Sequence, residues 1–582
     1  MRKIFIFVLA AMLFAAAAHS QTSKSARQWF DDGLQLLQQK KYAESVEAFR
    51  ASIKLDAKQP AALGNMGSAL VMLNRPADAV LAYRDAVKLD PNDGTLHSAL
   101  CTALTLANNA ADAIKECEIG VRLNPNAAES YSALIAAMRV SNVSPSDIQR
   151  QMDTAISRFP ENELLLGLAA WYYKDVGNLI YAAELYEHLL RVNAAPALYH
   201  ARLAVVYVLM ERDADALSHA RKALELEPNN PYALYAMGRL FFELGQNDEA
   251  ANAFLKIPEA SRDLPDAPYY AAMSEVRLGH QSNAVEILRQ LVRRFPDVFE
   301  YQKELGRRLD ERGYNEEAIG ALKKAVELKP ENIEALAGLS LAYSGLAQFD
   351  ESIAVLEKAQ KLYPGNQVID MLLGVSRGRR DAIAQIPQMK TALENDPSNL
   401  QIKLGLSEVL IYAHRIPEAE SYINDIIRLE PKDAQVYRRL TIAFSEAGEF
   451  DKALITCQKA LEIEQSPETY LGLAGMYAKL GKFEEASRAY QKVIELKPDT
   501  PNVMKIYADL LRNNGKRREA LEMYKRSLAI LPLNPPALYS AGLLSAKLGD
   551  SDAALKYLET LKTVDQASAK RLMRCLQLKI WQ

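Results

Sequence analysis

Apolar and small residues recur along most of the chain at steps of three and four, in two short runs separated by a turn. Such steps place side chains on one face of an α-helix, so each pair of runs predicts two amphipathic helices. The turn often holds Gly or Asn, and a proline commonly follows the second run, where it cannot continue a helix. The pattern therefore predicts a series of helical hairpins.

The hairpins repeat every 34 residues. Three kinds of residue keep this period in the last third of the chain: Gly481, Gly515 and Gly549; Ala486, Ala520 and Ala554; Pro498 and Pro532. The same phase holds near the start, where Gly67 and Ala79 take the places of two small residues and Tyr83 that of a large one. Small residues let the two helices of a hairpin approach closely, and we expect the large residue to fill the space towards the next hairpin.

This unit resembles the tetratricopeptide repeat, which reads W-x2-L-G-x2-Y, then A-x3-F, then P. The residues that carry the resemblance are Trp29, Gly33 and Phe49 in the first unit, and Tyr477, Gly481, Ala486, Tyr490 and Pro498 in a later one. About sixteen units fit in register. The resemblance implies an all-α fold, a right-handed superhelical solenoid of helix-turn-helix repeats whose first helices line the concave side.

We expect the solenoid to occupy residues 21–565, with irregular stretches near 141–146, 258–265 and 376–387. The first lengthens a turn, the second ends a helix early at Pro258, and the third places Gly378 and Pro387 where helix is expected. Each should change the stacking locally, because repeats contact only their neighbours. Residues 566–582 follow Asp565, a helix N-cap type, and predict a C-terminal capping helix.

Residues 1–20 have the pattern of a signal peptide. Arg2 and Lys3 precede fifteen apolar residues, and Ala18-His19-Ser20 offers small residues at the first and third places before the expected cleavage. An uncleaved membrane anchor is the alternative, but the apolar run is shorter than the roughly twenty residues that span a bilayer. We therefore expect an exported protein of the periplasm or the extracellular space, with no membrane span in the mature chain.

Net charge argues against nucleic acid as a ligand, and the absence of known motifs argues against a catalytic or metal site. The 582 residues are 49% hydrophobic and 25% charged, with a formal net charge of −3. Nucleic acid as the main ligand would need a concentrated basic face, and the near-neutral balance argues against one. The sequence has no G-x-S-x-G, no HExxH and no C-x2-C or H-x3-H pair. We therefore expect no catalytic site, cofactor or metal.

The four cysteines allow two interpretations. Cys101 and Cys117 fall on the two helices of one unit, at core positions. A disulfide between them would fit an oxidising compartment, whereas two buried free thiols would behave as small hydrophobic side chains. The sequence leaves both open. Cys457 and Cys575 are far apart and are predicted to be unpaired.

The strongest candidate for a partner site is a row of apolar and aromatic first-helix residues around one arginine. Its members are Trp171, Tyr235, Arg239, Phe242, Tyr269 and Met273. Exposed apolar patches often mark interfaces, and Tyr, Trp and Arg dominate interface energies. The alternative is that neighbouring helices shield these side chains from one another.

Later first helices carry mixed charge instead. The residues concerned are Glu300, Lys303, Arg307, Asp310, Arg438, Lys505, Asp509 and Arg512. Such a row suits a polar rim or a second partner surface, and a solvated helix face explains it equally well.

Together these features predict a non-enzymatic exported scaffold that holds protein or peptide partners in its concave groove, and the resemblance suggests a context of envelope assembly or secretion. A carbohydrate-binding or polysaccharide-export accessory protein is the alternative. Trp171, Tyr235 and Tyr269 would then supply rings that stack on sugars.

Overall fold

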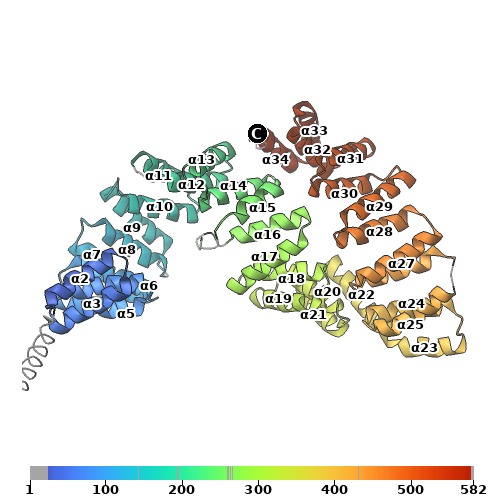
Figure 1. Ribbon diagram of the computed structural model, residues 1–582, viewed down its shortest axis with the longest axis horizontal. Coiled ribbons are helices and arrows are strands. Elements are labelled where there is room, and N and C mark those ends of the chain that lie inside the picture. The colour runs from blue at the N-terminus through green and yellow to red at the C-terminus, as the bar shows by residue number, and fades with distance from the viewer. Residues whose placement is uncertain are drawn as a thin grey trace, which may run out of the picture. The chain divides into compact units, whose positions relative to one another are not determined.

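The computed structural model describes residues 24–141, 143–192, 196–258, 261, 264, 266–429 and 432–578. The expected signal peptide and the last four residues of the expected cap lie outside them. Every regular element in the described part of the chain is an α-helix, and consecutive helices pair as hairpins (Figure 1). The predicted all-α repeat fold is confirmed.

The chain divides into two compact units after Met210. The first unit holds these described helices: α2 (Ala26–Gln38), α3 (Tyr42–Leu55), α4 (Pro60–Met72), α5 (Pro76–Leu89), α6 (Gly94–Leu106), α7 (Ala110–Leu123), α8 (Ala128–Arg139), α9 (Pro145–Arg158), α10 (Glu163–Asp175), α11 (Leu179–Val192) and α12 (Pro196–Leu209). Even numbers mark the first helix of each hairpin and odd numbers the second.

The second unit begins at Glu211. Its helices are α13 (Asp213–Leu226), α14 (Pro231–Glu243), α15 (Asn247–Leu255), α16 (Ala267–Leu278), α17 (Gln281–Arg294), α18 (Phe299–Glu311), α19 (Asn315–Leu328), α20 (Ile333–Ser344), α21 (Phe349–Leu362), α22 (Gln367–Ala384), α23 (Ile386–Asn395), α24 (Leu400–Tyr412), α25 (Ile416–Arg428), α26 (Ala434–Glu446), α27 (Phe450–Ile463), α28 (Pro467–Lys479), α29 (Phe483–Leu496), α30 (Pro501–Asn513), α31 (Arg517–Ile530), α32 (Pro535–Lys547), α33 (Ser551–Val564) and α34 (Gln566–Leu578).

In three described hairpins, the two helices meet where a glycine of the first faces an aromatic ring of the second. A Cβ atom on Gly67 would lie 2.8 Å from the ring of Tyr83, and one on Gly238 would lie 2.7 Å from the ring of Phe254. The expectation that Tyr83 fills the space towards the next hairpin needs correction, because its ring occupies the space left by the glycine of its own hairpin. Any side chain at these glycines would push the helices apart.

Most hairpin turns pass through one residue in the left-handed conformation. Glycine fills this place in most second-unit hairpins, as at Gly245 with φ 70°. Other residue types take it elsewhere, among them Glu211 with φ 56° and Ala347 with φ 56°. Since a Cβ atom makes this conformation unfavourable, the turn geometry is imposed by the packing of the two helices.

Two of the three irregular stretches can be followed in the helices beside them. Helix α15 has nine residues, where most second helices have 14, and its early end leaves a cavity of about 470 Å³ lined by Phe254, Leu291 and Phe295. Helix α22 continues through Gly378 for 18 residues, so the break falls at Gln385 and not at the glycine. The division after Met210 lies outside the three expected stretches.

The structure decides between the two interpretations of the cysteines. Cys101 on α6 and Cys117 on α7 form a disulfide, with their Cα atoms 5.2 Å apart. Cys457 and Cys575 are free and buried, as expected. Burial raises the pKa of the Cys457 thiol to about 11, so this thiol stays neutral at physiological pH.

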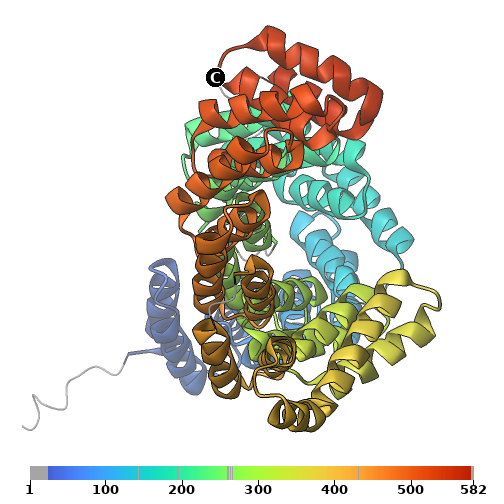
Figure 2. The ribbon, with the colours of Figure 1, turned by 90° about the vertical axis from the view of Figure 1, so that its right-hand side faces the viewer.

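The second unit also makes contacts between its own ends. Helix α34 packs beside α13, and in both views of the chain the red C-terminal helices lie next to green helices (Figures 1 and 2). The turn glycines take part: a Cβ atom on Gly245 would lie 3.1 Å from the Tyr539 hydroxyl, and one on Gly279 3.6 Å from the Asn513 amide. Turns at the ends of first helices therefore meet residues from distant hairpins of the same unit.

Replacing Ala347 by glycine should stabilise the second unit by about 0.5–1 kcal/mol, because glycine adopts the left-handed conformation without the Cβ penalty. The midpoint of thermal unfolding should rise. The matched control is Ala392→Gly at an exposed position inside α23, where glycine should lower stability by about 1 kcal/mol. A lower midpoint for Ala347→Gly would show that the turn does not require this conformation.

Removing the disulfide by Cys101→Ala and Cys117→Ala should destabilise hairpin α6–α7 by about 3 kcal/mol, since the bond closes a loop with a sequence separation of 16. Amide hydrogen exchange should accelerate in these two helices and stay unchanged in α28 and α29. Dithiothreitol should have the same effect on the wild type and none on the variant. Equal protection with and without the bond would contradict a stabilising role.

Candidate functional site

The six residues predicted as a partner site are divided between the two units. Trp171 belongs to α10 of the first unit, and the other five belong to α14 and α16 of the second. Trp171 is 38% exposed, and the guanidinium of Arg139 lies 3.6 Å from the centre of its ring. Arg139 also pairs with Asp175 at 3.5 Å. Trp171 thus offers one partly open aromatic surface beside a cation.

Tyr235 and Arg239 form the centre of the second-unit part. Tyr235 is only 6% exposed, and its hydroxyl donates to Asp266 at 2.7 Å and accepts from Arg239 at 3.0 Å. Burial raises the pKa of Tyr235, so the phenol stays protonated. Arg239 pairs with Glu243 at 3.3 Å and lies 4.4 Å from the centre of the Tyr270 ring. The polar groups of this pair are largely engaged inside the chain.

The remaining three residues also have partners within the chain. The Arg277 guanidinium lies 3.7 Å from the centre of the Phe242 ring, and Arg277 donates to the Phe242 carbonyl at 3.0 Å. The rings of Tyr269 and Tyr301 are 5.4 Å apart. Met273 and Tyr269 pack against the core formed by α16 to α20. The structure therefore brings all five second-unit residues into one region, and a partner contact for them stays a prediction.

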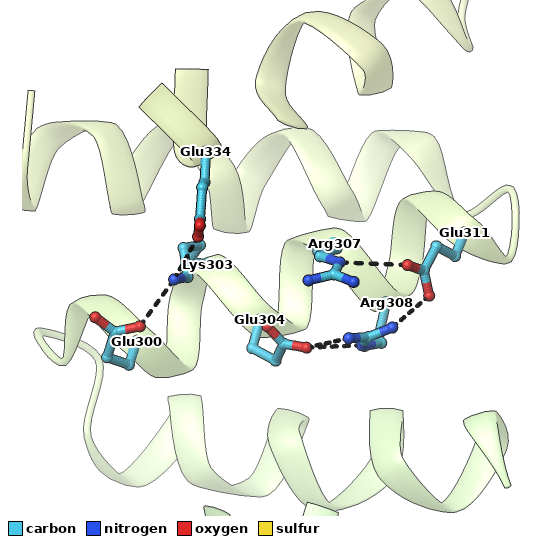
Figure 3. A network of polar contacts seen from close by, with 7 residues as sticks. All are labelled: Glu300, Lys303, Glu304, Arg307, Arg308, Glu311 and Glu334. Carbon is cyan, nitrogen blue, oxygen red and sulfur yellow. Dashed lines mark hydrogen bonds and ion pairs between the residues drawn. The ribbon is translucent and has the colours of Figure 1, made fainter. Parts of the chain in front are cut away.

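The charged row that follows is also paired internally (Figure 3). Lys303 on α18 lies 3.0 Å from Glu300 and 2.9 Å from Glu334, which comes from α20. Arg308 is buried with Glu304 and reaches Glu311 at 2.7 Å. The pairs inside α18 follow helical spacing, and the pair with Glu334 links two successive first helices.

The later charges of the row show the same behaviour. Arg438 pairs with Glu464 at 2.7 Å, and Lys505 pairs with Asp509 at 2.8 Å. Arg512 lies 3.5 Å from the same Asp509 carboxylate. These groups serve the packing of their own hairpins and of the next one.

Asp310 differs from its neighbours on α18. It is partly buried near the C-terminal end of the helix, where a negative charge is unfavourable. Burial, with a smaller contribution from the charge of Glu311, raises its pKa to about 6. This carboxylate therefore costs stability at neutral pH.

The first unit presents an open surface that the sequence reading missed. Met72, Leu106 and Val140 stand 34 residues apart at the C-terminal ends of α4, α6 and α8. They are 59%, 55% and 60% exposed. Trp171 lies on the next first helix, one helical turn before the equivalent place, which Asp175 holds. We call the three aliphatic residues and Trp171 the apolar row. An exposed apolar residue at one fixed place in three successive repeats is a signal that the 34-residue period already contains.

Residues around the apolar row are small or polar. Ser68, Thr102 and Ala136 lie one helical turn before its three aliphatic members, and all three are at least partly exposed. Small side chains leave room in front of the helices. The row ends at Trp171, beside the ion pair of Lys174 and Asp175 at 2.9 Å.

The spacing of the row limits what it can bind. Packed helices lie 8–10 Å apart, so successive aliphatic side chains follow one another at roughly 10 Å. An extended peptide covers about this distance with every third residue, and an α-helix with every seventh. A partner segment with apolar side chains at either interval would match Met72, Leu106 and Val140.

The described residues contain no group of three or more His, Cys, Asp or Glu side chains placed to hold a metal ion. Within the same ranges, no helix has the length and the apolar content to cross a bilayer.

Sequence profiles of the tetratricopeptide repeat match residues 30–94, 65–128, 207–276, 269–333, 311–374, 406–532 and 507–569. These matches cover more than half of the chain. The chain belongs to the tetratricopeptide repeat family. Such an array is a protein-interaction scaffold, because its stacked hairpins build an extended surface.

Curated relatives of this tetratricopeptide repeat protein are distant. Human protein O-mannosyl-transferase TMTC1 is 26% identical over 39% of this chain and 25% of its own length. Cellulose synthase operon protein C of Pseudomonas fluorescens is 23% identical over 53% of this chain and 26% of its own length. BBSome complex member bbs-4 of Caenorhabditis elegans is 23% identical over 53% of this chain and 70% of its own length. The chain thus spans about a quarter of the first two.

Two solved structures are similar in part. YrrB, described as a tetratricopeptide repeat protein with an unusual peptide-binding site, covers 32% of this chain and 96% of its own at 22% identity and a TM-score of 0.30. The Cut9–Hcn1 hetero-tetramer of APC/C matches 86% of this chain and 97% of the solved chain, with 14% identity and a TM-score of 0.31.

Replacing Asp310 by asparagine should stabilise the protein by about 2 kcal/mol at pH 7.5, and by much less at pH 4.5. A carboxyl whose pKa is raised by folding holds its proton more tightly in the folded state. The wild type therefore loses stability as the pH rises from about 4 to 6, and asparagine removes that loss. Thermal unfolding across this range should show it.

The control for this pH series is Glu394→Gln at an exposed position on α23, which should leave the profile unchanged. An equal change in stability from Asp310→Asn at both pH values would show that burial of the Asp310 carboxylate does not destabilise the protein.

Proposed function

We propose that this protein is an exported, non-enzymatic scaffold that binds a protein partner along the apolar row of its first unit. The observation that carries the proposal is the regular exposure of Met72, Leu106 and Val140 at the same place in three successive first helices. Repetition at a fixed interval gives a long binding surface from one repeated contact, which is how solenoid proteins recognise extended partners. Trp171 supplies an aromatic anchor at one end of the row.

The contrast between the two units supports this placement. In the second unit, the corresponding places of α14, α16 and α18 hold Glu243, Arg277 and Glu311. Each of them makes a contact within the chain, as Glu243 does with Arg239. In the first unit the aliphatic side chains face solvent. An incoming apolar segment would bury these side chains, and each Å² of buried apolar surface would contribute about 25 cal/mol to the free energy of binding.

Two features support export. The N-terminal twenty residues have the pattern of a cleaved leader, and the mature sequence holds a disulfide between Cys101 and Cys117. Disulfides persist in the periplasm and in extracellular space and are rare in reducing compartments. We place the scaffold in such a compartment, where assembly of envelope structures or secretion would use it.

The proposal includes no catalytic step. The transferase and the cellulose synthase operon protein extend far beyond the part that this chain matches, so their activities are not transferred to it. A polysaccharide ligand is the second candidate, because the operon protein matches 53% of this chain and Trp171 is partly exposed. The Arg139 guanidinium over the Trp171 ring favours a protein, because it covers a face that a sugar would need.

Replacing Met72, Leu106 and Val140 together by glutamate should reduce recovery of the partner at least tenfold. The loss of three apolar contacts and the introduction of three charges both oppose binding. The measurement is cross-linked affinity capture from envelope extract with residues 21–582 as bait, after circular dichroism shows equal helicity.

The matched control carries glutamate at Leu81, Leu89 and Leu123, which are exposed apolar residues on second helices. It should recover the partner as the wild type does. Equal recovery by both variants would show that the apolar row does not bind the partner. Recovery of polysaccharide instead of protein would favour the second candidate.

A further inference from the structure

Four acidic side chains gather at the start of the second unit. Glu211 and Asp213 lie at the N-terminus of α13, Glu243 is the last residue of α14, and Glu249 belongs to the first turn of α15. We call these four residues the acidic surface. Each of them pairs with a basic residue from the C-terminal end of the same unit.

Helix α34 supplies two of the basic residues, four positions apart. Arg574 donates hydrogen bonds from two nitrogens to the carboxylate of Asp213, one of them at 2.5 Å. It also lies 3.7 Å from Glu243. Lys570 pairs with Glu211. Residues four apart lie on one helical face, so α34 meets the acidic surface with a basic stripe. The Arg574 pair is nearly buried, which makes this contact specific as well as electrostatic.

Further side chains from α34 and α32 contact the C-terminal end of α14 beside these ion pairs. Cys575 is fully buried, with its sulfur 3.7 Å from the carbonyl oxygen of Leu244. Tyr539 from α32 donates a hydrogen bond to the same carbonyl, and Lys547 pairs with Glu249 at 2.7 Å. The C-terminal end of α14 is thus covered by a small side chain from α34 and by groups from α32.

Helix α34 uses a different face to cap its own end of the solenoid. Leu572 is fully buried, and a Cβ atom on Gly542 of α32 would lie 2.6 Å from its Cδ2 atom. The capping contact and the contact with the acidic surface therefore involve different side chains. Substitutions at Lys570 and Arg574 would change the second contact and leave Leu572 in place.

The contact with the acidic surface is imperfect. Gln246 is 2% exposed, its amide nitrogen lies 3.8 Å from the Cys575 sulfur, and its carbonyl oxygen has no hydrogen-bond partner among the described residues. Within the same residues, the second carboxylate oxygen of Glu249 and the hydroxyl of Ser545 on α32 are also buried without a partner. These are polar atoms that a better-fitting ligand would satisfy, and their burial weakens the closed arrangement.

We propose that the acidic surface is a binding site for a basic amphipathic helix of a partner protein, and that α34 occupies this site in the free chain. The partner helix would carry Lys or Arg residues four apart beside a small apolar residue, as α34 does with Lys570, Arg574 and Cys575. The site is distinct from the apolar row, which lies in the other unit. Binding would replace α34, while the contacts of α32 through Tyr539 and Lys547 would remain.

The test uses the full chain and a synthetic peptide of residues 566–578 as the probe. The variant Lys570→Glu with Arg574→Glu should release α34 from the acidic surface, and it should bind the labelled peptide at least tenfold more tightly than the wild type. Adding Asp213→Lys to this variant should abolish the gain, because it removes the main partner of Arg574. Fluorescence anisotropy measures all three affinities.

Two further variants serve as controls. Lys556→Glu with Lys562→Glu makes the same charge change at exposed positions of α33 and should bind the peptide as weakly as the wild type. The triple glutamate variant of the apolar row should also behave as the wild type, so failure of one proposal does not imply failure of the other.

Amide hydrogen exchange checks the structural side. In the released variant α34 should exchange faster, α13 should lose protection, and added peptide should restore the protection of α13. No peptide binding by a released variant that remains folded would overturn the proposal. A wild-type chain that dimerises by exchanging α34 would also overturn it, because the occupant would then be a second copy.

Discussion

The close approach of the two helices in a hairpin is the constraint on which the rest of the structure depends, and in three described hairpins it takes the form of a first-helix glycine against an aromatic ring. Gly33 with Phe49, Gly67 with Tyr83 and Gly238 with Phe254 repeat it along the chain. Each ring buries a large apolar surface, worth roughly 2–3 kcal/mol, inside its own hairpin. The second helix packs against one face of the first helix. Packing in the hairpin core therefore does not restrict which residues occupy another face of the first helix. That face is where the two units differ.

The two units differ in how they use the free face of their first helices, although Leu341, Ile442 and Ile506 on first helices of the second unit are exposed as well. In the first unit Met72, Leu106 and Val140 are exposed aliphatic side chains at one place in three successive repeats. In the second unit the chain covers much of it, through aromatic stacking around Arg239, ion pairs around Lys303 and contacts between turns such as Gly245 and Tyr539. This cover leaves buried polar atoms without partners, each at a cost of about 1–3 kcal/mol, so it is less favourable than the core of a hairpin.

The sequence predicts the local part of this structure and little of the rest, and the reason is physical. Packing inside and between neighbouring hairpins repeats every 34 residues, so Gly67 and the prolines reveal it without any long-range information. The same phase correctly placed Tyr235 and Arg239 on one face, but it could not show that Asp266 and Tyr270 from the next hairpin occupy them. The bond from Tyr539 to Leu244 joins residues 295 positions apart and follows no period. Met72, Leu106 and Val140 are also periodic, so the sequence contains the signal for their row, but they lack the aromatic rings that distinguish the predicted site.

A site that its own chain occupies must be held weakly if a partner is to use it. A tethered helix acts at an effective concentration on the order of millimolar, and the apparent affinity of a partner falls in proportion to the fraction of time that the site is open. A complete set of hydrogen bonds between α34 and the acidic surface would make that fraction very small. The carbonyl oxygen of Gln246, which has no hydrogen-bond partner among the described residues, raises it, while the Arg574 pair with Asp213 keeps the closed form specific. The imperfect contact is therefore what a displaceable helix requires, and a stronger one would turn α34 into a purely structural cap.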